Sequence, residues 1–258
     1  MALRNLAHQF KQRDWAGVVF EIAVVVVGVY LGLQASNWNQ DRLDHARGRE
    51  YLQRMAGDLQ VETRLLSQTL AFQNQVGDYG KGAIGYAESG KLYRDSPWQT
   101  VLAYYQASQI WGYRQPSTTF QEIQSSGELS LIENPSLRAR IAAHYGENAG
   151  SRAMEVIGVV PKYRERVRGL TLWAIQQYIW THCYRSGTNL GQLLVDCPSP
   201  ISDAEASALL EQLRGDSELT SELRFWLASV GVNKLVLATI QDEAKGLEGN
   251  VNAELARR

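Results

Sequence analysis

The residue of this chain with the clearest potential for chemistry is a carboxylate inside an apolar segment. Glu21 lies within WAGVVFEIAVVVVGVYLGLQASNW, which extends from Trp15 to Trp38. A carboxylate in hydrocarbon costs roughly 3 kcal/mol, so such residues are usually paired or functional. A contact that reaches back to Lys11 or Arg13, or simple protonation, would explain Glu21 without any function.

Small residues accompany this carboxylate along one side of the same segment. Together with Glu21 they recur at steps of four and seven residues, which return close to one face of a helix. The residues of this face are Gly17, Glu21, Gly28, Gly32 and Ser36. Gly28 and Gly32 form a GxxxG pair, which lets two helix backbones approach closely in a membrane. We predict that this face contacts a second transmembrane helix, from another copy of the chain or from a different membrane protein.

Two other motifs resemble nucleotide and metal sites but are incomplete. The run 85–91 has the spacing of a phosphate-binding loop, yet Leu92 stands where Ser or Thr would bind magnesium, so we expect a helix break. His182, Cys183 and Cys197 offer three ligands, whereas structural zinc takes four. An even cysteine count around a turn-rich stretch favours a disulfide between Cys183 and Cys197, with two unpaired buried thiols as the alternative.

No set of catalytic residues is recognisable in the sequence. There is no HExxH or GxSxG motif, and His45 and His144 each stand alone in a predicted helix. We therefore predict a protein that is not an enzyme and has no cofactor and no bound metal.

Aromatic and basic residues leave two further alternatives open. The aromatic residues of 98–120, with Trp173, Tyr178 and Trp180, are most simply packing residues, but they could line a ligand pocket between helices. The basic run Lys162–Arg168 is interrupted by Glu165. It is most simply a solvated face, with contact to lipid headgroups or an acidic partner as the alternative.

The element that must position the small-residue face is a membrane-spanning helix over residues 15–38, preceded by a flank over 1–14. A span needs roughly 20 mostly apolar residues, and Trp favours the water–lipid boundary at each end. The run exceeds the roughly 7–15 apolar residues of a signal peptide, so we expect an uncleaved anchor in the lipid bilayer. The numbers of basic residues on the two sides of the span are nearly equal, so they do not decide its orientation. The predicted disulfide favours an oxidising compartment for the C-terminal domain. We predict a bacterial inner-membrane protein, single-pass, with its C-terminal domain in the periplasm.

The rest of the chain has helical patterns throughout. A membrane-proximal long helix is predicted over 39–90, because Leu52, Met55, Leu59, Leu66 and Leu70 recur near coiled-coil spacing. We expect the regular helix to reach about Val76, where a glycine-rich patch weakens or ends it.

Residues 91–258 are predicted to form a helical extramembrane domain. Helix starts are expected at Ser96-Pro97, Ser117–Thr119, Asn134-Pro135, Ser202 or Asp203, and Asp216 or Ser217, and a long helix kinked at Pro161 is expected over 151–184. No sustained period-two pattern is present, so the predicted fold class is all-α: one transmembrane helix continuing into a long amphipathic helix and a multi-helix bundle.

Two blocks carry a family resemblance. FEIAVVVVGVYLGLQASNWNQDR contains a Glu, an apolar run, a Gly and a closing NWN, and TTFQEIQSSGELSLIENPSLRARIAAHY contains an aromatic, SSG, a leucine pair, Ile, Asn and a helix ending in Tyr. In these features the chain resembles a family of uncharacterised bacterial single-pass proteins, domain of unknown function 6090, over roughly a fifth of its length. Ala35-Ser36 before Asn37 departs mildly from that family's anchor. The resemblance implies an anchor plus a helical domain and supplies no activity.

Bulk composition narrows the function further. The formal net charge of −1 over 258 residues gives no electrostatic footprint for nucleic acid. We expect a membrane-anchored interaction or scaffold protein that assembles through its transmembrane and membrane-proximal helices, as a homo-oligomer or with another membrane protein. The alternative is a helical periplasmic sensor that binds a small ligand in an aromatic pocket.

Overall fold

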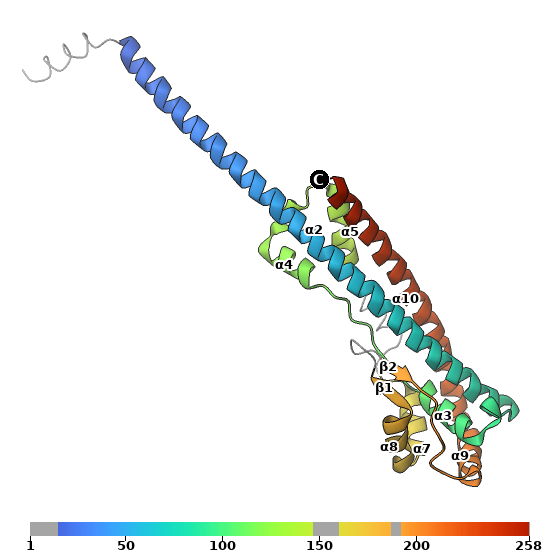
Figure 1. Ribbon diagram of the computed structural model, residues 1–258. Coiled ribbons are helices and arrows are strands. Elements are labelled where there is room, and N and C mark those ends of the chain that lie inside the picture. Colours follow the sequence, from blue (N-terminus) through green and yellow to red (C-terminus); the bar gives the residue numbers. More distant parts are fainter. Residues whose placement is uncertain (1–14, 147–159, 187–191, 258) are drawn as a thin grey trace, which may run out of the picture.

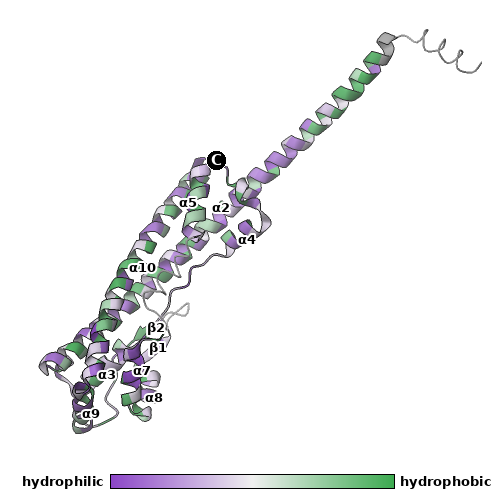
Figure 2. Cartoon of the chain, turned by 180° about the vertical axis from the view of Figure 1, so that it is seen from behind, coloured by the Kyte–Doolittle hydropathy of each residue, from purple (hydrophilic) through white to green (hydrophobic). Residues whose placement is uncertain are grey.

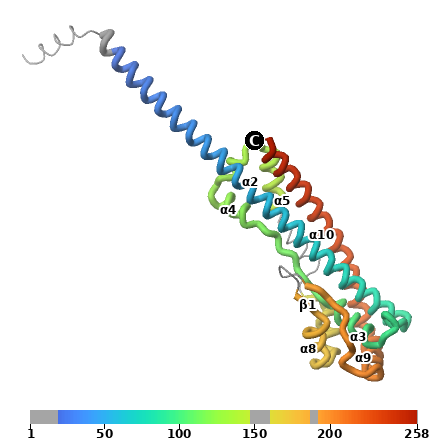
Figure 3. The backbone as a smooth tube through the Cα atoms, in the orientation of Figure 1, coloured from blue at the N-terminus to red at the C-terminus, as the bar shows by residue number. Residues whose placement is uncertain are grey.

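The computed structural model describes residues 15–146, 160–186 and 192–257, and one long helix organises them. Helix α2 (Trp15–Ser89) has 75 residues and is therefore about 110 Å long at 1.5 Å per residue. Its N-terminal part projects alone, whereas its C-terminal part lies against the 41-residue helix α10 (Ser217–Arg257) (Figures 1 and 3). The predicted all-α fold class is confirmed, and no break separates the apolar part of α2 from its amphipathic part.

Helices α2 and α10 pack as an antiparallel coiled coil. Gly80 faces Leu227, and Gln241 donates to the Thr63 carbonyl oxygen at 3.3 Å, so the two helices run in opposite directions. Buried positions of α2 alternate by three and four residues: Leu52, Met55, Leu59, Glu62, Leu66, Thr69, Gln73 and Val76. Those of α10 do the same: Leu219, Leu223, Trp226, Val230, Asn233, Leu237, Ile240, Ala244, Leu247, Val251 and Glu254. This is the heptad pattern of a coiled-coil seam.

Shorter elements divide the body into two lobes along this seam. The distal lobe, farther from the projecting end of α2, contains η1 (Tyr93–Asp95), α3 (Pro97–Ala107), α7 (Lys162–Leu170), α8 (Trp173–His182), β1 (Tyr184–Ser186), β2 (Gln192–Leu194) and α9 (Asp203–Gly215). The proximal lobe contains α4 (Thr118–Ser126), η2 (Glu128–Leu131) and α5 (Pro135–Gly146). Each lobe has its own cluster of buried apolar side chains, and both clusters include residues of α2 and α10.

Several predicted helix boundaries are confirmed by their capping contacts. The Ser96 side chain accepts from the backbone N–H of Gln99 at the start of α3. Ser202 and Glu205 form a reciprocal capping box that begins α9. Asp216 accepts from the Leu219 N–H at 2.9 Å, and this bond helps to hold the pKa of its carboxyl below the usual range.

The expected weakening of α2 after Val76 is wrong. Residues 77–89 continue the helix, which ends only where Gly90 adopts a left-handed conformation with φ of 75°. Two of the glycines sit where neighbours approach closely: a Cβ at Gly80 would meet Leu227, and one at Gly82 would meet Tyr93. The intrinsic cost of glycine, about 1 kcal/mol each, is therefore offset by close packing.

The single long helix expected over 151–184 is also wrong. Its first part, 151–159, lies outside the described residues. Pro161 precedes α7 as its N-cap instead of kinking a helix, and the extended backbone at Thr171 and Leu172 separates α7 from α8. A short antiparallel hairpin follows, with Tyr184 paired to Leu194, Arg185 to Leu193 and Ser186 to Gln192.

Candidate membrane and interaction sites

The projecting part of α2 exposes a surface that is mostly apolar towards its free end. Every residue from Val19 to Leu43 is exposed. The large apolar side chains of this stretch are between half and three-quarters accessible: Val19, Phe20, Ile22, Val24, Val25, Val26, Val27, Val29, Tyr30, Leu31, Leu33, Trp38 and Leu43. Burying one such aliphatic side chain is worth about 1.5–3 kcal/mol, so an apolar surface of this size is stable only against lipid or another protein. Figure 2 shows the hydrophobic colour concentrated towards the free end of α2, whereas the part of the projecting helix nearer the body is mainly hydrophilic.

Two helices, α2 and α10, are long and apolar enough to cross a membrane, but their surroundings differ. In the apolar window of α2 no residue is buried, whereas a third of the corresponding window of α10 is buried. The buried face of α10 is the seam with α2, as expected for the core helix of a bundle. Its outer side still exposes Phe225, Val232 and Leu235.

The predicted helix-contact face lies on the projecting part of α2. Gly17 is in the helix, and Glu21 and Ser36 are exposed. A Cβ added at Gly28 or Gly32 would meet nothing within 4 Å, so both backbones are open to close approach. Contact between this face and a second helix stays a prediction.

The predicted disulfide is confirmed and joins the two ends of the hairpin, which lies against α2. Cys183 and Cys197 are bonded, with Cα atoms 5.1 Å apart. The Gln75 side chain donates to the Leu194 carbonyl oxygen at 3.2 Å and accepts from the Leu194 N–H at 3.3 Å, as a neighbouring strand would. Trp98 Nε1 donates to the Cys197 carbonyl oxygen at 3.0 Å. Across the described residues, no group of three or more His, Cys, Asp or Glu side chains could hold a metal ion.

A buried polar cluster in the proximal lobe escaped the sequence reasoning. His144, predicted to stand alone, places Nε2 3.0 Å from Oε2 of the fully buried Glu62. Oε1 of Glu62 accepts from the Tyr113 hydroxyl at 2.6 Å and from Gln115 at 3.2 Å. Burial, followed by the charge of Glu62, raises the pKa of Tyr113 far above its ordinary value. The sequence did contain a signal for this cluster. Glu62 lies at the seam spacing between Leu59 and Leu66, and a carboxylate buried there needs a hydrogen-bonding partner.

This cluster ties α2, α5 and the segment between α3 and α4 together. Each oxygen of Glu62 is occupied by a neighbouring donor from α5 or from the segment between α3 and α4. Removing one member would leave a buried group unpaired, which typically costs several kcal/mol. The cluster therefore acts as a structural tie.

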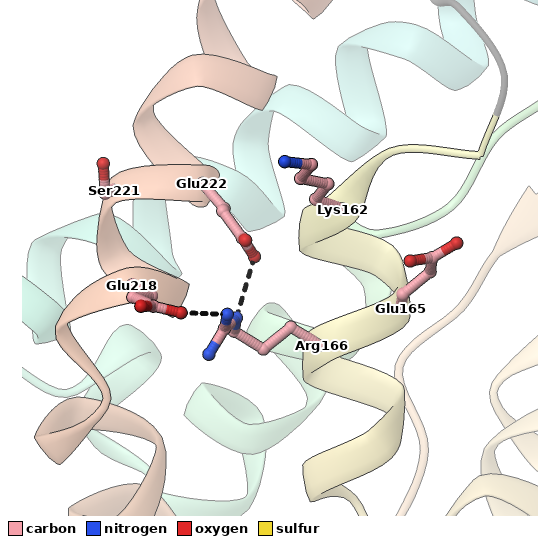
Figure 4. Close-up of a pocket in the computed structure, with 6 residues that line it drawn as sticks. All are labelled: Lys162, Glu165, Arg166, Glu218, Ser221 and Glu222. Carbon is pink, nitrogen blue, oxygen red and sulfur yellow. Dashed lines mark hydrogen bonds and ion pairs between the residues drawn. The ribbon is translucent and has the colours of Figure 1, made fainter.

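The basic run of α7 is not a uniform solvated face. Arg166 is bound by three carboxylates: Asp216 at 3.3 Å, Glu222 at 3.1 Å, and Glu218. Figure 4 shows Arg166 between Glu218 and Glu222 in an open cleft of about 700 Å³, with Lys162, Glu165 and Ser221 on its walls.

Arg164 and Arg168 point away from that cleft and lie against the end of α3. Arg164 donates to the Ser108 carbonyl oxygen at 2.6 Å, and Arg168 donates to the Gln109 side chain at 3.1 Å. Burial, followed by the like charge of Arg168, lowers the pKa of Arg164 to about 10. Arg164 therefore remains cationic at neutral pH.

The predicted aromatic core is confirmed in part. Five of its nine residues are buried: Trp98, Tyr104, Tyr105, Tyr113 and Phe120. Trp111 and Tyr178 are half-buried and pack against the core of the distal lobe. By contrast, Trp173 is 70% exposed and Trp180 is 38% exposed, so α8 presents indole rings to its surroundings. A smaller surface pocket of about 200 Å³, between α2 and β2, has Asp78, Arg94 and Asp196 among its lining residues, with Tyr79 and Tyr93 as its aromatic members.

Comparisons of the chain with protein-family models, with curated proteins and with solved structures gave no match. The resemblance to the family of unknown function therefore stays a prediction, and the geometry described above carries the functional argument.

Proposed function

We propose that this chain is a non-enzymatic, single-pass membrane protein that acts as an anchored scaffold. The observation that carries the proposal is the contrast within α2: 25 consecutive exposed residues, rich in Val, Leu and Ile, run without a break into a tightly packed coiled coil. Lipid is the solvent in which such a helix surface is stable, because its backbone groups are bonded internally and its side chains are apolar.

The same helix would serve as an anchor and as a rigid spacer. From Trp38 to Gln75, α2 extends about 55 Å at 1.5 Å per residue, and α10 reinforces much of that length. The distal lobe would accordingly stand well away from the bilayer. A buried disulfide fits an oxidising compartment, which supports placement of the body in the periplasm of a bacterial inner-membrane protein.

Assembly through the span supplies the scaffold role. The small-residue face with Gly28 and Gly32 is open, and Glu21 adds a polar group that a helix neighbour in lipid would satisfy. We propose a homo-oligomer, or a complex with another membrane protein, formed along this face.

The proposal is tested on the full chain in two steps. The protein should remain in the membrane pellet after alkaline carbonate extraction, and recovery in the soluble fraction would refute the anchor. In detergent it should form a defined oligomer that Gly28→Ile and Gly32→Ile disperse. Gly57→Ile is the matched control, because Gly57 is an exposed glycine of the same helix outside the span with nothing within 4 Å of its added Cβ. Equal effects of all three substitutions would exclude the glycine face.

A further inference from the structure

An apolar surface lies on α8 at the end of the molecule farthest from the projecting part of α2 (Figure 1). Leu172 and Trp173, at the turn between α7 and α8, are 69% and 70% exposed, and Trp180 is 38% exposed. Trp173, Gln177 and Trp180 follow one another at steps of four and three, so they share a face of α8, and all three are exposed. We call Leu172, Trp173, Gln177 and Trp180 the α8 surface.

The segment that carries the α8 surface is basic in sequence. The segment 162–186 contains five Lys or Arg residues and one acidic residue, a net charge of +4, in a chain whose total is −1. The rest of the chain therefore carries a net charge of −5. Arg166 is neutralised by Asp216 and by Glu218 and Glu222, of which Figure 4 shows the last two. No carboxylate of the described residues lies within ion-pair distance of Arg164 or Arg168.

One of these unneutralised cations lies beside the exposed aromatic face. The Arg168 guanidinium lies 5.4 Å from the centre of the Trp180 ring and 4.8 Å from that of Tyr105. Its hydrogen bonds to Ser108 and Gln109 fix it there, so the charge is already positioned before any partner arrives. Trp and Arg are among the residue types enriched at the energetic centres of protein interfaces.

We infer that the α8 surface, with Arg168 and Arg164 beside it, binds an acidic segment of a partner protein that carries apolar residues. Charge complementarity selects the acidic class, because a carboxylate would supply the counter-charge that Arg164 and Arg168 lack within the described fold. Trp173 and Leu172 would supply the apolar contact. The inference deepens the proposed scaffold function by naming the kind of partner that the scaffold holds.

The anchoring bilayer is a poorer candidate for the same surface. Since α2 is continuous, the direction of the body follows the tilt of the span, which averages about 20° in membrane proteins. The α8 surface then stands roughly 50 Å from the headgroups, whereas the surface potential decays over about 8 Å.

The test uses the full chain in nanodiscs of uncharged phosphatidylcholine. A fluorescein-labelled amphipathic peptide of Leu and Glu is titrated by anisotropy, with a Leu and Lys peptide of the same length as the charge control. We expect saturable binding of the acidic peptide only, weakened at least tenfold by Trp173→Ala and by Arg168→Gln. Phe225→Ala is the matched control, because Phe225 is a 77% exposed aromatic on α10, and it should leave binding unchanged.

Several outcomes would overturn the inference. These are absence of acidic-peptide binding, equal binding of both peptides, or wild-type affinity in Trp173→Ala, an exposed position whose substitution leaves the fold intact. Binding of the loaded nanodiscs to phosphatidylglycerol vesicles through Trp173 would assign the surface to lipid instead. Carbonate extraction and oligomer size do not depend on the α8 surface, so failure here is distinguishable from failure of the anchored scaffold.

Discussion

The two halves of α2 have the same backbone and opposite side-chain environments. In the first half every described side chain up to Leu43 is exposed, although the sequence there is the most apolar in the chain. In the second half the apolar residues occupy a heptad seam and are buried against α10 and the lobes. The two halves therefore differ in the placement of their apolar residues, which lie all around the helix in the first half and on one stripe in the second.

The largest expected effect is that alkaline pH unfolds the packed half of α2 and leaves the apolar half helical. Burial raises the pKa of the Tyr104, Tyr145 and Tyr163 hydroxyls well above the usual value near 10, so these groups keep their protons while the body is folded. An unfolded tyrosine ionises near pH 10. The folded state then binds more protons than the unfolded state, and the free energy of unfolding falls as the pH rises above about 10.

We expect the body to unfold completely at strongly alkaline pH while the span stays in the membrane. Circular dichroism and tyrosinate absorbance should change together, and the protein should still sediment with lipid. Ionisation of all tyrosines well before the loss of helix would show that these hydroxyls are not buried.

A matched pair of leucines tests the packed half directly. Leu66→Ala should lower the free energy of unfolding of the body by roughly 2–5 kcal/mol, because Leu66 is fully buried in the seam and its truncation leaves a cavity. Leu31→Ala removes the same atoms from a side chain that is 60% exposed, and it should leave the thermal melt of the body unchanged. Similar losses from both would mean that the two halves of α2 fold as one unit.

A matched pair of valines tests the half assigned to lipid. Val25→Arg should disfavour membrane insertion by about 3 kcal/mol, since a cation would lie inside the hydrocarbon. Val61→Arg places the same charge on an exposed position of the packed half, at 43% accessibility, and should not change the membrane-bound fraction. Unchanged partitioning of both variants would argue that residues 15–38 do not span the bilayer.

The smallest expected effects come from two glycines of the packed half. Gly57 is exposed with open space around it, so Gly57→Ala should raise the free energy of unfolding by about 0.5–1 kcal/mol through helix propensity. Gly48→Ala should lower it, because the new Cβ would collide with the Leu131 backbone carbonyl. Melting temperatures of the two variants on either side of the wild type would confirm both signs.

The long helices and their seam could be predicted because their signals are local and repeated. Leu52, Leu59 and Leu66 are one heptad apart, and each is buried where that spacing places it. The remaining seam positions were harder to predict, because several of them are polar. Gln73 and Asn233 occupy it fully buried, with no hydrogen-bond partner for either side-chain amide in the described structure, and periodicity of apolar residues does not detect them.

Features that depend on tertiary contacts could not be predicted. The tie between Glu62 and His144 joins residues 82 positions apart, and each residue alone reads as an ordinary helix residue. The hairpin strands have three residues each, too few for alternation to register. Tryptophan is usually largely buried, so Trp173 was predicted to be a packing residue, whereas its side chain is exposed.

The continuity of α2 has a mechanical consequence. No hinge separates the apolar stretch of α2 from the coiled coil, so in the proposed membrane arrangement the helix would act as a rigid lever that pivots in the bilayer. A reorientation of the anchor by 10° would sweep the far lobe sideways by about 10 Å, since the arm is about 55 Å long. Small movements within the lipid would thus be magnified into displacements as wide as a helix.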